Sequence, residues 1–375
     1  METAGEEANW RRLFDEVPRW PFIPSLVWVD NPAGRGFVSL SRDEEPERWH
    51  AYVKSDEPIV TQVDDGRFAV TDVGQTPTSS NSKPSLVAEM LDVLELQPGH
   101  RVLEIGTGTG WNAALLSSRV GPAGVVVSIE IDPAIALSAK ESLSAAGYGP
   151  IVVVADGSDG YAHCAMYDRV IATASVRRIP RAWIEQTSPR GVIVAPWGTD
   201  YCNGALLRLT VADDGSASGR FGRNLEFMRV RSQRREFIDP TDEQIAMAHR
   251  STTSLRGHNM YELVEFSRAA FAIGLRVPNC YRTVEETAKK FRHIVELHDT
   301  TTRSWARVDT DPDVEAFEVL QFGPRCLWDE VEAAYDWWRD RGEPGPERFG
   351  LTTWANGGQE VWLDEPGGAD RWAVD

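Results

Sequence analysis

A glycine-rich turn flanked by two acidic residues is the first candidate for chemistry in this chain of 375 residues. The segment 101–132 reads RVLEIGTGTGWNAALLSSRVGPAGVVVSIEID and contains Glu104, Gly106, Gly108, Gly110 and Glu130. Glycine lets the backbone approach a ligand closely because it has no Cβ. A carboxylate that follows such a turn by about 20 residues can accept hydrogen bonds from ribose hydroxyls. The pattern therefore predicts a site for a nucleoside-containing ligand.

The spacing of the glycines narrows the class of ligand. The dinucleotide motif G-x-G-x-x-G would need glycine at position 111, which is Trp111, and a P-loop would need G-K-[ST], which the sequence lacks. The extra acid Glu104 favours a ligand with an ammonium group and a sulfonium and with no phosphate. S-adenosylmethionine is such a ligand; NAD or a ligand-free Rossmann-type turn are the alternatives.

Alternating strands and helices are needed to position these residues. The apolar runs 101–105, 125–130, 151–155, 169–173 and 191–196 predict strands, and the segments between them are compatible with helices. This alternation predicts a Rossmann-like α/β sheet, mostly parallel and covered on both faces. Open α/β sheets bind ligands at the carboxyl ends of their strands. Here those ends carry the glycine turn, Glu130, Asp156 and Thr173.

The rest of the chain predicts a cap and an accessory domain around this core. Residues 1–70 are predicted as an N-terminal cap segment with a helix over 9–17, and 71–235 as the core, with a polar, turn-prone stretch at 71–84. Residues 236–375 are predicted as an α+β accessory domain. Further predicted elements are antiparallel strands at 205–212 and 225–232, helices at 242–250, 260–271 and 283–297, strands at 305–308, 349–354 and 359–363, and a hairpin turn at 356–358.

Composition argues against several classes of partner. The net charge of −18 disfavours nucleic acid and anionic membrane surfaces. No apolar run approaches the ~18 residues of a membrane span, and the acidic N-terminus does not resemble a secretion signal. The four cysteines are scattered, which is typical of reduced thiols in a cytoplasmic protein. No metal-ligand spacing is found.

Several segments are shared with one known family. They are SKPSLVAEML (82–91), RVLEIGTGTGWNAALL (101–116), Glu130, VADGSDGY (154–161) and YDRVIATAS (167–175), with weaker echoes at 17–24, 51–59 and 74–76. Through them the chain resembles the protein-L-isoaspartate O-methyltransferases. It departs from the family in the enlarged gap Pro77–Asn81 and in the long tail. The tail resembles the methyltransferases of ribosomal peptide (graspetide or lanthipeptide) maturation, in which an aspartyl ester collapses to aspartimide or isoaspartate.

The resemblance implies roles for individual residues. Ser82, with Ser80 as a second candidate, should contact the substrate carboxylate, Glu130 the ribose, and Asp156 with Gly157 the adenine. The residues expected to bind the cofactor are Glu104, Gly106, Thr107, Gly108, Gly110, Asn112, Glu130, Ile131, Asp156, Gly157 and Thr173, and those expected to bind substrate include Thr76 and Lys83. The alternatives are that Ser82 only caps the following helix and that Asp156 is only a turn residue.

An arginine stripe near the end of the predicted core suggests a substrate surface. Arg229 and Arg231 stand on the predicted strand 225–232, where an ordinary solvated face is the simplest interpretation. The sharper hypothesis is a dock for an acidic peptide, since guanidinium groups pair well with carboxylates.

These observations predict an S-adenosylmethionine-dependent carboxyl O-methyltransferase acting on Asp or isoAsp in a peptide. A carboxylate with a pKa near 4 is ionised at pH 7, so the reaction requires no general base. A dedicated ribosomal peptide is the preferred substrate, general isoaspartate repair is the alternative, and a non-catalytic binding module is a second alternative. The sequence leaves open which peptide is used, whether Asp or isoAsp is the acceptor, and the oligomeric state.

Overall fold

The chain forms two compact units whose segments interleave along the sequence. The computed structural model describes residues 12–67, 72–253, 255, 257–264, 267–287, 292–311 and 313–374. Unit 1 comprises residues 1–174, 180–195 and 208–217, and unit 2 comprises residues 175–179, 196–207 and 218–375. The domain boundaries predicted after 70 and 235 stay a prediction, and the two units are described separately below. Their segments are joined by contacts between residues far apart in the sequence, which local patterns do not encode.

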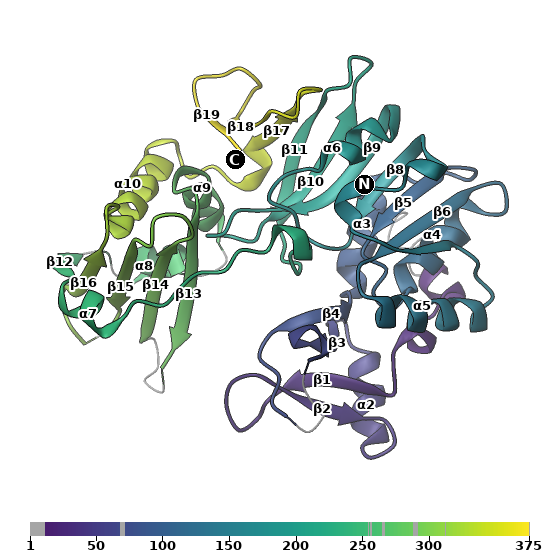
Figure 1. The fold of residues 1–375 in the computed structure, drawn as a ribbon, viewed down its shortest axis with the longest axis horizontal. Helices are drawn as coiled ribbons and strands as arrows, with labels where there is room; N and C mark the ends of the chain where they lie inside the picture. The colour runs from purple at the N-terminus through teal and green to yellow at the C-terminus, as the bar shows by residue number, and fades with distance from the viewer. Residues whose placement is uncertain are drawn as a thin grey trace. The chain divides into compact units, whose positions relative to one another are not determined.

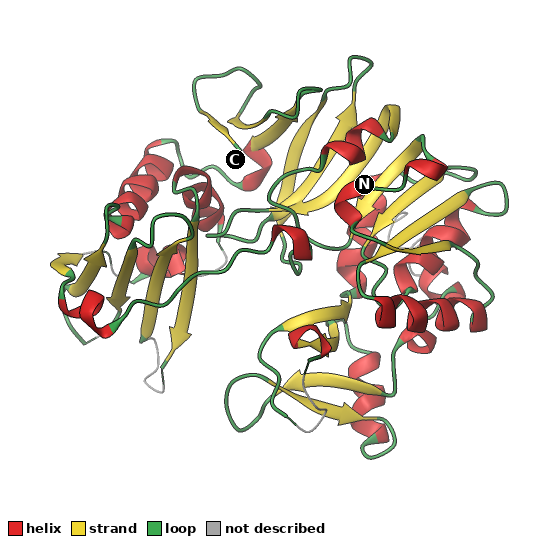
Figure 2. Cartoon of the chain, viewed as in Figure 1, coloured by secondary structure: helices red, strands yellow, loops and turns green. Residues whose placement is uncertain are grey.

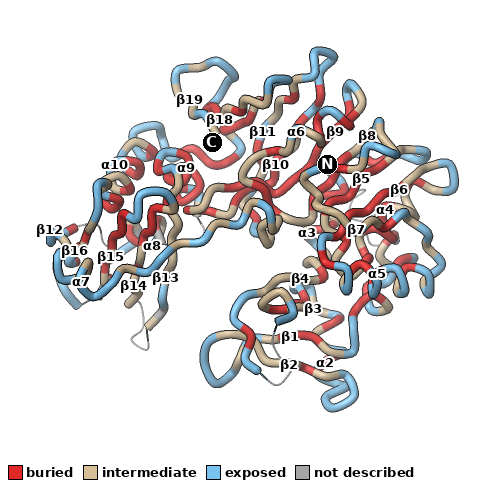
Figure 3. Tube along the Cα trace, viewed as in Figure 1, coloured by how far each residue is buried: buried red, intermediate tan, exposed pale blue. Residues whose placement is uncertain are grey.

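A parallel sheet forms the centre of unit 1 (Figure 1). Its strands run in the order β9-β8-β5-β6-β7, and all four neighbouring pairs are parallel. The strands are β5 (Arg101–Ile105), β6 (Val125–Glu130), β7 (Ile151–Val154), β8 (Tyr167–Ala172) and β9 (Thr187–Trp197). Their apolar runs are buried, as Figure 3 shows for β5, β6 and β8. The predicted Rossmann-like sheet is confirmed.

Four helices of unit 1 precede or connect the strands of the parallel sheet. The four are α3 (Pro84–Leu94), α4 (Trp111–Val120), α5 (Pro133–Ala145) and α6 (Arg181–Glu185). Two of them, α3 and α5, begin with a proline in the first turn. In α5 the Asp132 carboxylate accepts hydrogen bonds from Ala134 N and Ile135 N, and Pro133 occupies the first turn. In α3 the apolar side chains Val87, Met90, Leu91 and Leu94 recur every three to four residues and are buried.

A second, antiparallel sheet is formed by the N-terminal part of unit 1. Its strands β1 (Leu26–Asp30), β2 (Phe37–Ser41), β3 (Ile59–Val63) and β4 (Pro77–Asn81) are ordered β2-β1-β3-β4, and helix α2 (Pro46–Val53) contributes Trp49 to its core. β4 was predicted as part of a turn-prone loop, and that prediction is wrong. Small polar residues have little propensity for strands, so it is the pairing with β3 that determines the conformation of β4. Of the helix predicted at 9–17, residues 12–16 are helical and 9–11 lie outside the described residues.

Unit 2 contains an antiparallel five-stranded sheet with helices beside it (Figure 2). The order is β12-β16-β15-β14-β13, and a second group of strands is ordered β19-β18-β17-β11. The strands are β10 (Ala205–Val211, shared between the units), β11 (Ala217–Asn224), β12 (His249–Thr253), β13 (Cys280–Glu286), β14 (His293–Asp299), β15 (Trp305–Asp309), β16 (Phe317–Phe322), β17 (Phe349–Thr353), β18 (Gln359–Leu363) and β19 (Arg371–Ala373). The helices are α7 (Asp242–Ala246), α8 (His258–Val264), α9 (Arg268–Arg276) and α10 (Leu327–Asp340). The predicted α+β character is confirmed.

Several predicted elements of the tail are wrong. The helix predicted at 283–297 is replaced by β13 and β14, which pair with each other, while 288–291 lie outside the described residues. Charged residues in these strands favour helix locally, and the sheet pairing overrides that preference. The strand predicted at 225–232 lies instead at β11, and α10 has no counterpart among the predictions. β15, β17 and β18 agree with the predicted strands. No helix in the described part of the chain has the length and apolar character to cross a membrane.

Candidate active site

The glycine turn after β5 adopts a conformation that only glycine accepts easily. Gly106, Gly108 and Gly110 have φ of 91°, 52° and 88°. A Cβ on Gly106 would lie 2.8 Å from Thr173 Oγ1, and a Cβ on Gly108 would lie 3.3 Å from the Ser80 carbonyl oxygen. The turn is fixed to the next strand by Gly106 N, which donates to Ile129 O at 2.8 Å. The geometry forms a backbone cradle at the carboxyl end of the sheet.

Glu130 is held in place by two backbone amides at the end of β6. Its two carboxylate oxygens accept from Gly108 N at 3.0 Å and from Asp132 N at 3.1 Å. Each oxygen keeps a further lone pair for a ligand hydroxyl. The neighbouring Ile131 side chain is 37% exposed and offers an apolar surface. A carboxylate next to an exposed apolar side chain fits a ribose and its base.

Glu104 lies beneath the turn and is fully buried. Its Oε1 accepts from Asn112 Nδ2 at 2.7 Å and its Oε2 from Ser128 Oγ at 2.5 Å, while Thr107 Oγ1 and Ser128 Oγ are 2.6 Å apart. Burial raises the pKa of Glu104 to about 7, against the effect of the two hydrogen bonds, and the charge of Glu130 adds to the rise. Each Glu104 oxygen thus accepts a hydrogen bond within the protein. The predicted contact of Glu104 with the ligand stays a prediction.

The ends of β7 and β8 support the turn. Asp156 Oδ1 accepts from Ser158 N at 2.8 Å and caps a short 3-10 helix, η3 (Gly157–Asp159). A Cβ on Gly157 would lie 2.4 Å from Ile105 Cγ2, so this position also requires glycine. Thr173 Oγ1 donates to Gly106 O at 2.6 Å. Asp156 thus caps the turn at this strand end, its adenine contact stays a prediction, and Thr173 braces the cradle.

The segment Ser80–Ser82 lies against the cradle. Asn81 Nδ2 donates to Thr109 Oγ1 at 2.7 Å, which joins the end of β4 to the glycine turn. The N-cap residue of α3 is Lys83, and no side chain caps that helix. Ser82 is half-buried, and its hydroxyl has no hydrogen-bond partner among the described residues. The interpretation of Ser82 as a helix cap is therefore wrong, and its hydroxyl is available to a substrate.

Two other residues predicted to bind substrate are placed differently. Thr76 precedes β4 and Ser82 follows it, so at about 3.3 Å per residue they lie roughly 20 Å apart along the strand. The two residues would therefore contact different parts of a substrate, and the role of Thr76 stays a prediction. Lys83 Nζ lies 3.6 Å from Asp56 Oδ2, and Asp56 also accepts from Ser85 N. Lys83 therefore ties α3 to the N-terminal sheet.

Arg19 is the principal site residue that sequence reasoning missed. It is buried, and burial lowers its pKa to about 10, which leaves it cationic at neutral pH. In the sequence, a role for Arg19 was indicated only by its position in VPRWPFIP (17–24), a segment that weakly resembles the family. Its guanidinium donates to the Asn81 side chain and to the main-chain carbonyls of Ser55 (3.2 Å), Glu57 (2.8 Å), Asn81 (3.0 Å) and Ser82 (3.2 Å). Arg19 thereby fixes the segment that carries Ser82.

The arginines predicted to bind a peptide lie in unit 2, after the end of β11. Arg229 donates to the carbonyls of Gly198 (3.0 Å) and Thr199 (2.9 Å), and burial lowers its pKa to about 10. Its interpretation as part of an exposed strand face is wrong, since it supports the loop after β9. Arg231 begins a 3-10 helix, η5 (Arg231–Gln233). Within the described ranges, no three His, Cys, Asp or Glu side chains converge as a metal site would require.

Comparisons with known proteins agree with this geometry. Residues 57–235 match the family model of protein-L-isoaspartate(D-aspartate) O-methyltransferase. The chain is 45% identical over 116 residues to the protein-L-isoaspartate O-methyltransferase of Ignicoccus hospitalis, a match that spans 31% of the chain and 55% of that relative. It is 35% identical over 214 residues to the enzyme of Pyrococcus abyssi, across 56% of the chain and 89% of the relative.

A solved protein-L-isoaspartate O-methyltransferase has the same fold along nearly the whole chain. The similarity covers 97% of both chains with a TM-score of 0.52 and 21% identity. That structure aligns with the tail as well, so a fold of this length occurs in a protein of this name. By the match to its core and to the Pyrococcus abyssi relative, the chain belongs to the protein-L-isoaspartate O-methyltransferase family.

Proposed function

We propose that this protein is an S-adenosylmethionine-dependent carboxyl O-methyltransferase that methylates isoaspartyl residues in peptides and proteins. The observation that carries the proposal is the free Ser82 hydroxyl on a segment joined to the glycine turn through Asn81. Family membership supports the acceptor. The aligned tail of the solved structure removes the reason for preferring one dedicated ribosomal peptide, so general isoaspartate repair becomes the favoured substrate reading.

The cradle has the chemistry that this donor requires. Two carboxylates, Glu104 and Glu130, lie at the ends of adjacent parallel strands and favour a cation over a phosphate. Glu130 is oriented for ribose hydroxyls, and the exposed Ile131 gives the adenine an apolar surface. When bound, S-adenosylmethionine supplies an electrophilic methyl group. The protein's own residues orient the two reactants.

The acceptor carboxylate requires alignment and no deprotonation. A peptide carboxylate is ionised at neutral pH, and a hydrogen bond from Ser82 would fix one of its oxygens. Holding two reactants in the correct geometry can lower a barrier by roughly 7–11 kcal/mol. Arg19 and Asn81 supply that alignment by fixing the main chain at Ser82 and joining it to Thr109.

Replacing Ser82 by alanine is expected to lower kcat on an isoaspartyl peptide by roughly 10- to 100-fold, the effect of losing one hydrogen bond to a charged group. Donor affinity, measured by calorimetry, should be unchanged, because Ser82 contacts the acceptor only. Ser144→Ala, an exposed serine on α5, is the matched control. Full activity of Ser82→Ala would contradict the assigned role.

The acceptor itself is tested with three synthetic peptides that differ only in carrying isoAsp, Asp or Asn at one position. Methyl ester formation on the isoAsp peptide alone is the expected result. Methylation of the Asp peptide and not of the isoAsp peptide would favour the dedicated-peptide alternative. Donor binding without turnover of any peptide would favour a non-catalytic binding module.

Donor binding is expected to strengthen as the pH rises through about 7. Since burial raises the pKa of Glu104 to about 7, its carboxyl is neutral below that pH and ionised above it. A cationic ligand stabilises the ionised form, so linkage requires tighter binding where Glu104 is ionised, by up to about tenfold per pH unit below the pKa. Calorimetry across this range measures the slope. Glu104→Gln should flatten it, and an equal slope in that variant would exclude Glu104 as its source.

A further inference from the structure

The strand β4, which leads to Ser82, is joined to the candidate donor site at two places. One is the hydrogen bond from Asn81 Nδ2 to Thr109 Oγ1, at 2.7 Å. The other runs through Gln62 of β3, whose Nε2 donates to Asp132 Oδ2 at 3.1 Å. Because β3 and β4 pair as antiparallel neighbours, a contact made by β3 also restrains β4.

A β-bulge directs the Gln62 side chain. The pairing of β3 with β4 shifts its register on both sides of Gln62, which pairs with Ser79. Bulges re-aim individual side chains and are frequent beside active sites. Gln62 Oε1 accepts from Thr78 Oγ1 at 2.8 Å, and Thr78 Oγ1 in turn accepts from Asp65 N at 3.0 Å. The oxygen of the carboxamide is thus bound by β4, while its nitrogen reaches the start of α5.

Asp132 connects this glutamine to the residue predicted to hold the ribose. Asp132 is buried, and its Oδ1 caps α5 by accepting from Ala134 N at 3.0 Å and from Ile135 N at 3.4 Å. Its own N–H donates to Glu130 Oε1 at 3.1 Å. A single residue, itself fixed by the helix that it caps, therefore lies between Gln62 and Glu130.

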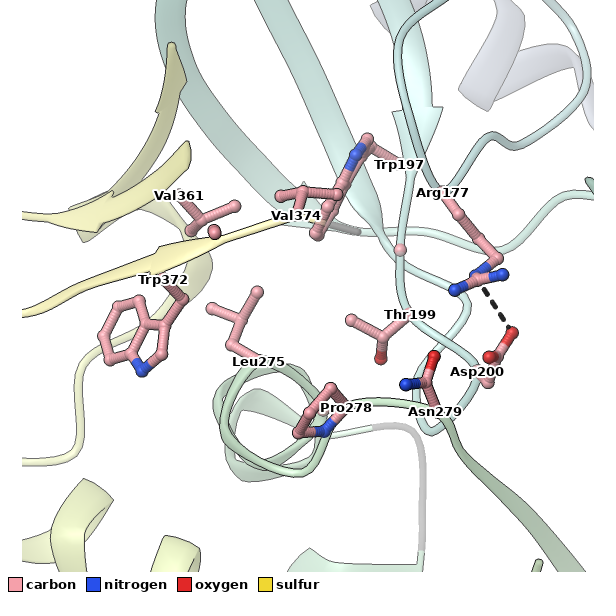
Figure 4. A pocket seen from close by; sticks show the side chains of 13 residues that line it. Arg177, Trp197, Thr199, Asp200, Leu275, Pro278, Asn279, Val361, Trp372 and Val374 are labelled. Carbon is pink, nitrogen blue, oxygen red and sulfur yellow. Dashed lines mark ion pairs between the residues drawn. The ribbon is translucent and has the colours of Figure 1, made fainter. Parts of the chain in front are cut away.

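The charged groups of the pocket shown in Figure 4 pair within unit 2. Arg177 Nε lies 3.2 Å from Asp200 Oδ1, and Arg235 Nη1 lies 3.9 Å from Asp200 Oδ2. The contact of Gln62 with Asp132 instead lies wholly in unit 1, the unit that contains the candidate active site.

Two separated contacts fix the orientation of β4, which a single contact would leave free to turn. Gln62 pairs with Ser79, two residues before Asn81, so the contacts lie roughly 7 Å apart along the strand. We propose that Gln62 is a positioning residue that holds the strand leading to Ser82 in a fixed orientation to the ribose site at Glu130. The inference rests on the proposed function for the identity of the two reactants. Misplacing a reactant by about 1 Å can cost about 100-fold in rate.

Gln62→Leu is expected to lower kcat on an isoaspartyl peptide, at saturating donor, by about tenfold or more. The affinity for S-adenosylhomocysteine should change by less than about threefold, because Glu130 keeps both of its amide donors. Gln97→Leu, the same substitution at an exposed residue between α3 and β5, is the matched control. An unchanged kcat in Gln62→Leu, or equal losses of kcat and donor affinity, would overturn the proposal.

Gln62→Glu adds a measurement that a purely structural role would not change. The variant keeps an oxygen that can accept from Thr78, and it places a second carboxyl against Asp132. Two adjacent carboxylates repel each other, whereas a protonated one can donate to the other. The kcat of this variant, divided by that of the unaltered chain at the same pH, should therefore rise by about tenfold between about pH 8 and about pH 5.5. The same ratio for Gln62→Leu should stay constant.

The other acids on the adjoining elements are common to all the proteins compared. They are Asp64 and Asp65 of the 3-10 helix η2 (Asp64–Gly66) and Glu130 of β6. Dividing by the kcat of the unaltered chain at each pH therefore removes their titration, and that of Glu104, from the comparison.

A ratio for Gln62→Glu that does not depend on pH would overturn the proposal even if Gln62→Leu failed to fold, which binding of S-adenosylhomocysteine reports. Turnover by the unaltered chain separates this inference from the proposed function. An unaltered chain that methylates no peptide would overturn the proposed function and this inference with it. Normal turnover that is insensitive to Gln62→Leu would overturn this inference alone.

Discussion

Replacing Glu130 by alanine is expected to reduce donor affinity by about 100-fold or more. In the proposed function the variant loses a carboxylate that accepts from two ribose hydroxyls, and a hydrogen bond to a charged group contributes about 1.5–3 kcal/mol. It also leaves the amides of Gly108 and Asp132 without their acceptor, so the glycine turn loses its fixed position. Calorimetry with S-adenosylhomocysteine measures the affinity directly.

Glu141→Ala is the control for this substitution, because Glu141 is an exposed acid on α5. Both variants lower the negative charge of the chain by one, so a general electrostatic effect would appear in both. Near-normal donor affinity in Glu130→Ala would show that the ligand does not use the end of β6. The assignment of the cradle as the donor site would then fail.

Replacing Arg19 by leucine should lower kcat by about 100-fold and destabilise the fold by about 3 kcal/mol or more. The guanidinium serves four main-chain carbonyls and the Asn81 side chain, and each buried acceptor left unpaired costs about 1–3 kcal/mol. The loss of kcat follows because Ser82 is no longer held beside the glycine turn. Turnover on an isoaspartyl peptide and urea denaturation measure the two effects.

A comparison of donor affinity with kcat distinguishes a positioning role of Arg19 from a general loss of structure. Donor affinity should fall much less than kcat in Arg19→Leu, because Arg19 fixes the Ser80–Ser82 segment and makes no contact with Glu130. Arg48→Ala, an arginine half exposed on α2, should change neither quantity. Equal losses of donor affinity and kcat would show that Arg19 supports the whole of unit 1 and has no specific role at Ser82.

The two variants test different halves of one arrangement. In the proposed function Glu130 and the glycine turn belong to the donor half, and Arg19 with Ser82 belongs to the acceptor half. Asn81 joins the halves through its bond to Thr109. In Glu130→Ala the loss of activity should therefore come from weaker donor binding, and in Arg19→Leu it should come from a lower kcat.

The sequence alone determined the local conformation of the predicted donor half. The strand, glycine turn, helix and second strand are contiguous in the chain, and their periodicity, their glycines and the position of Glu130 are local features. Positive φ at three glycines and parallel pairing of β5 with β6 follow from those features without knowledge of the remaining chain. The family resemblance extended the prediction to Ser82.

Only the tertiary structure decided how the acceptor half and the tail are built. Arg19 reaches Asn81 and Ser82 across more than sixty positions of the chain, β4 is a strand because β3 pairs with it, and β13 and β14 pair against their local helical preference. The burial of Glu104 likewise depends on segments distant in sequence. So do the hydrogen bonds through which Arg229 supports the loop after β9. Local propensities amount to a fraction of a kcal/mol per residue, so pairing and burial between distant segments override them.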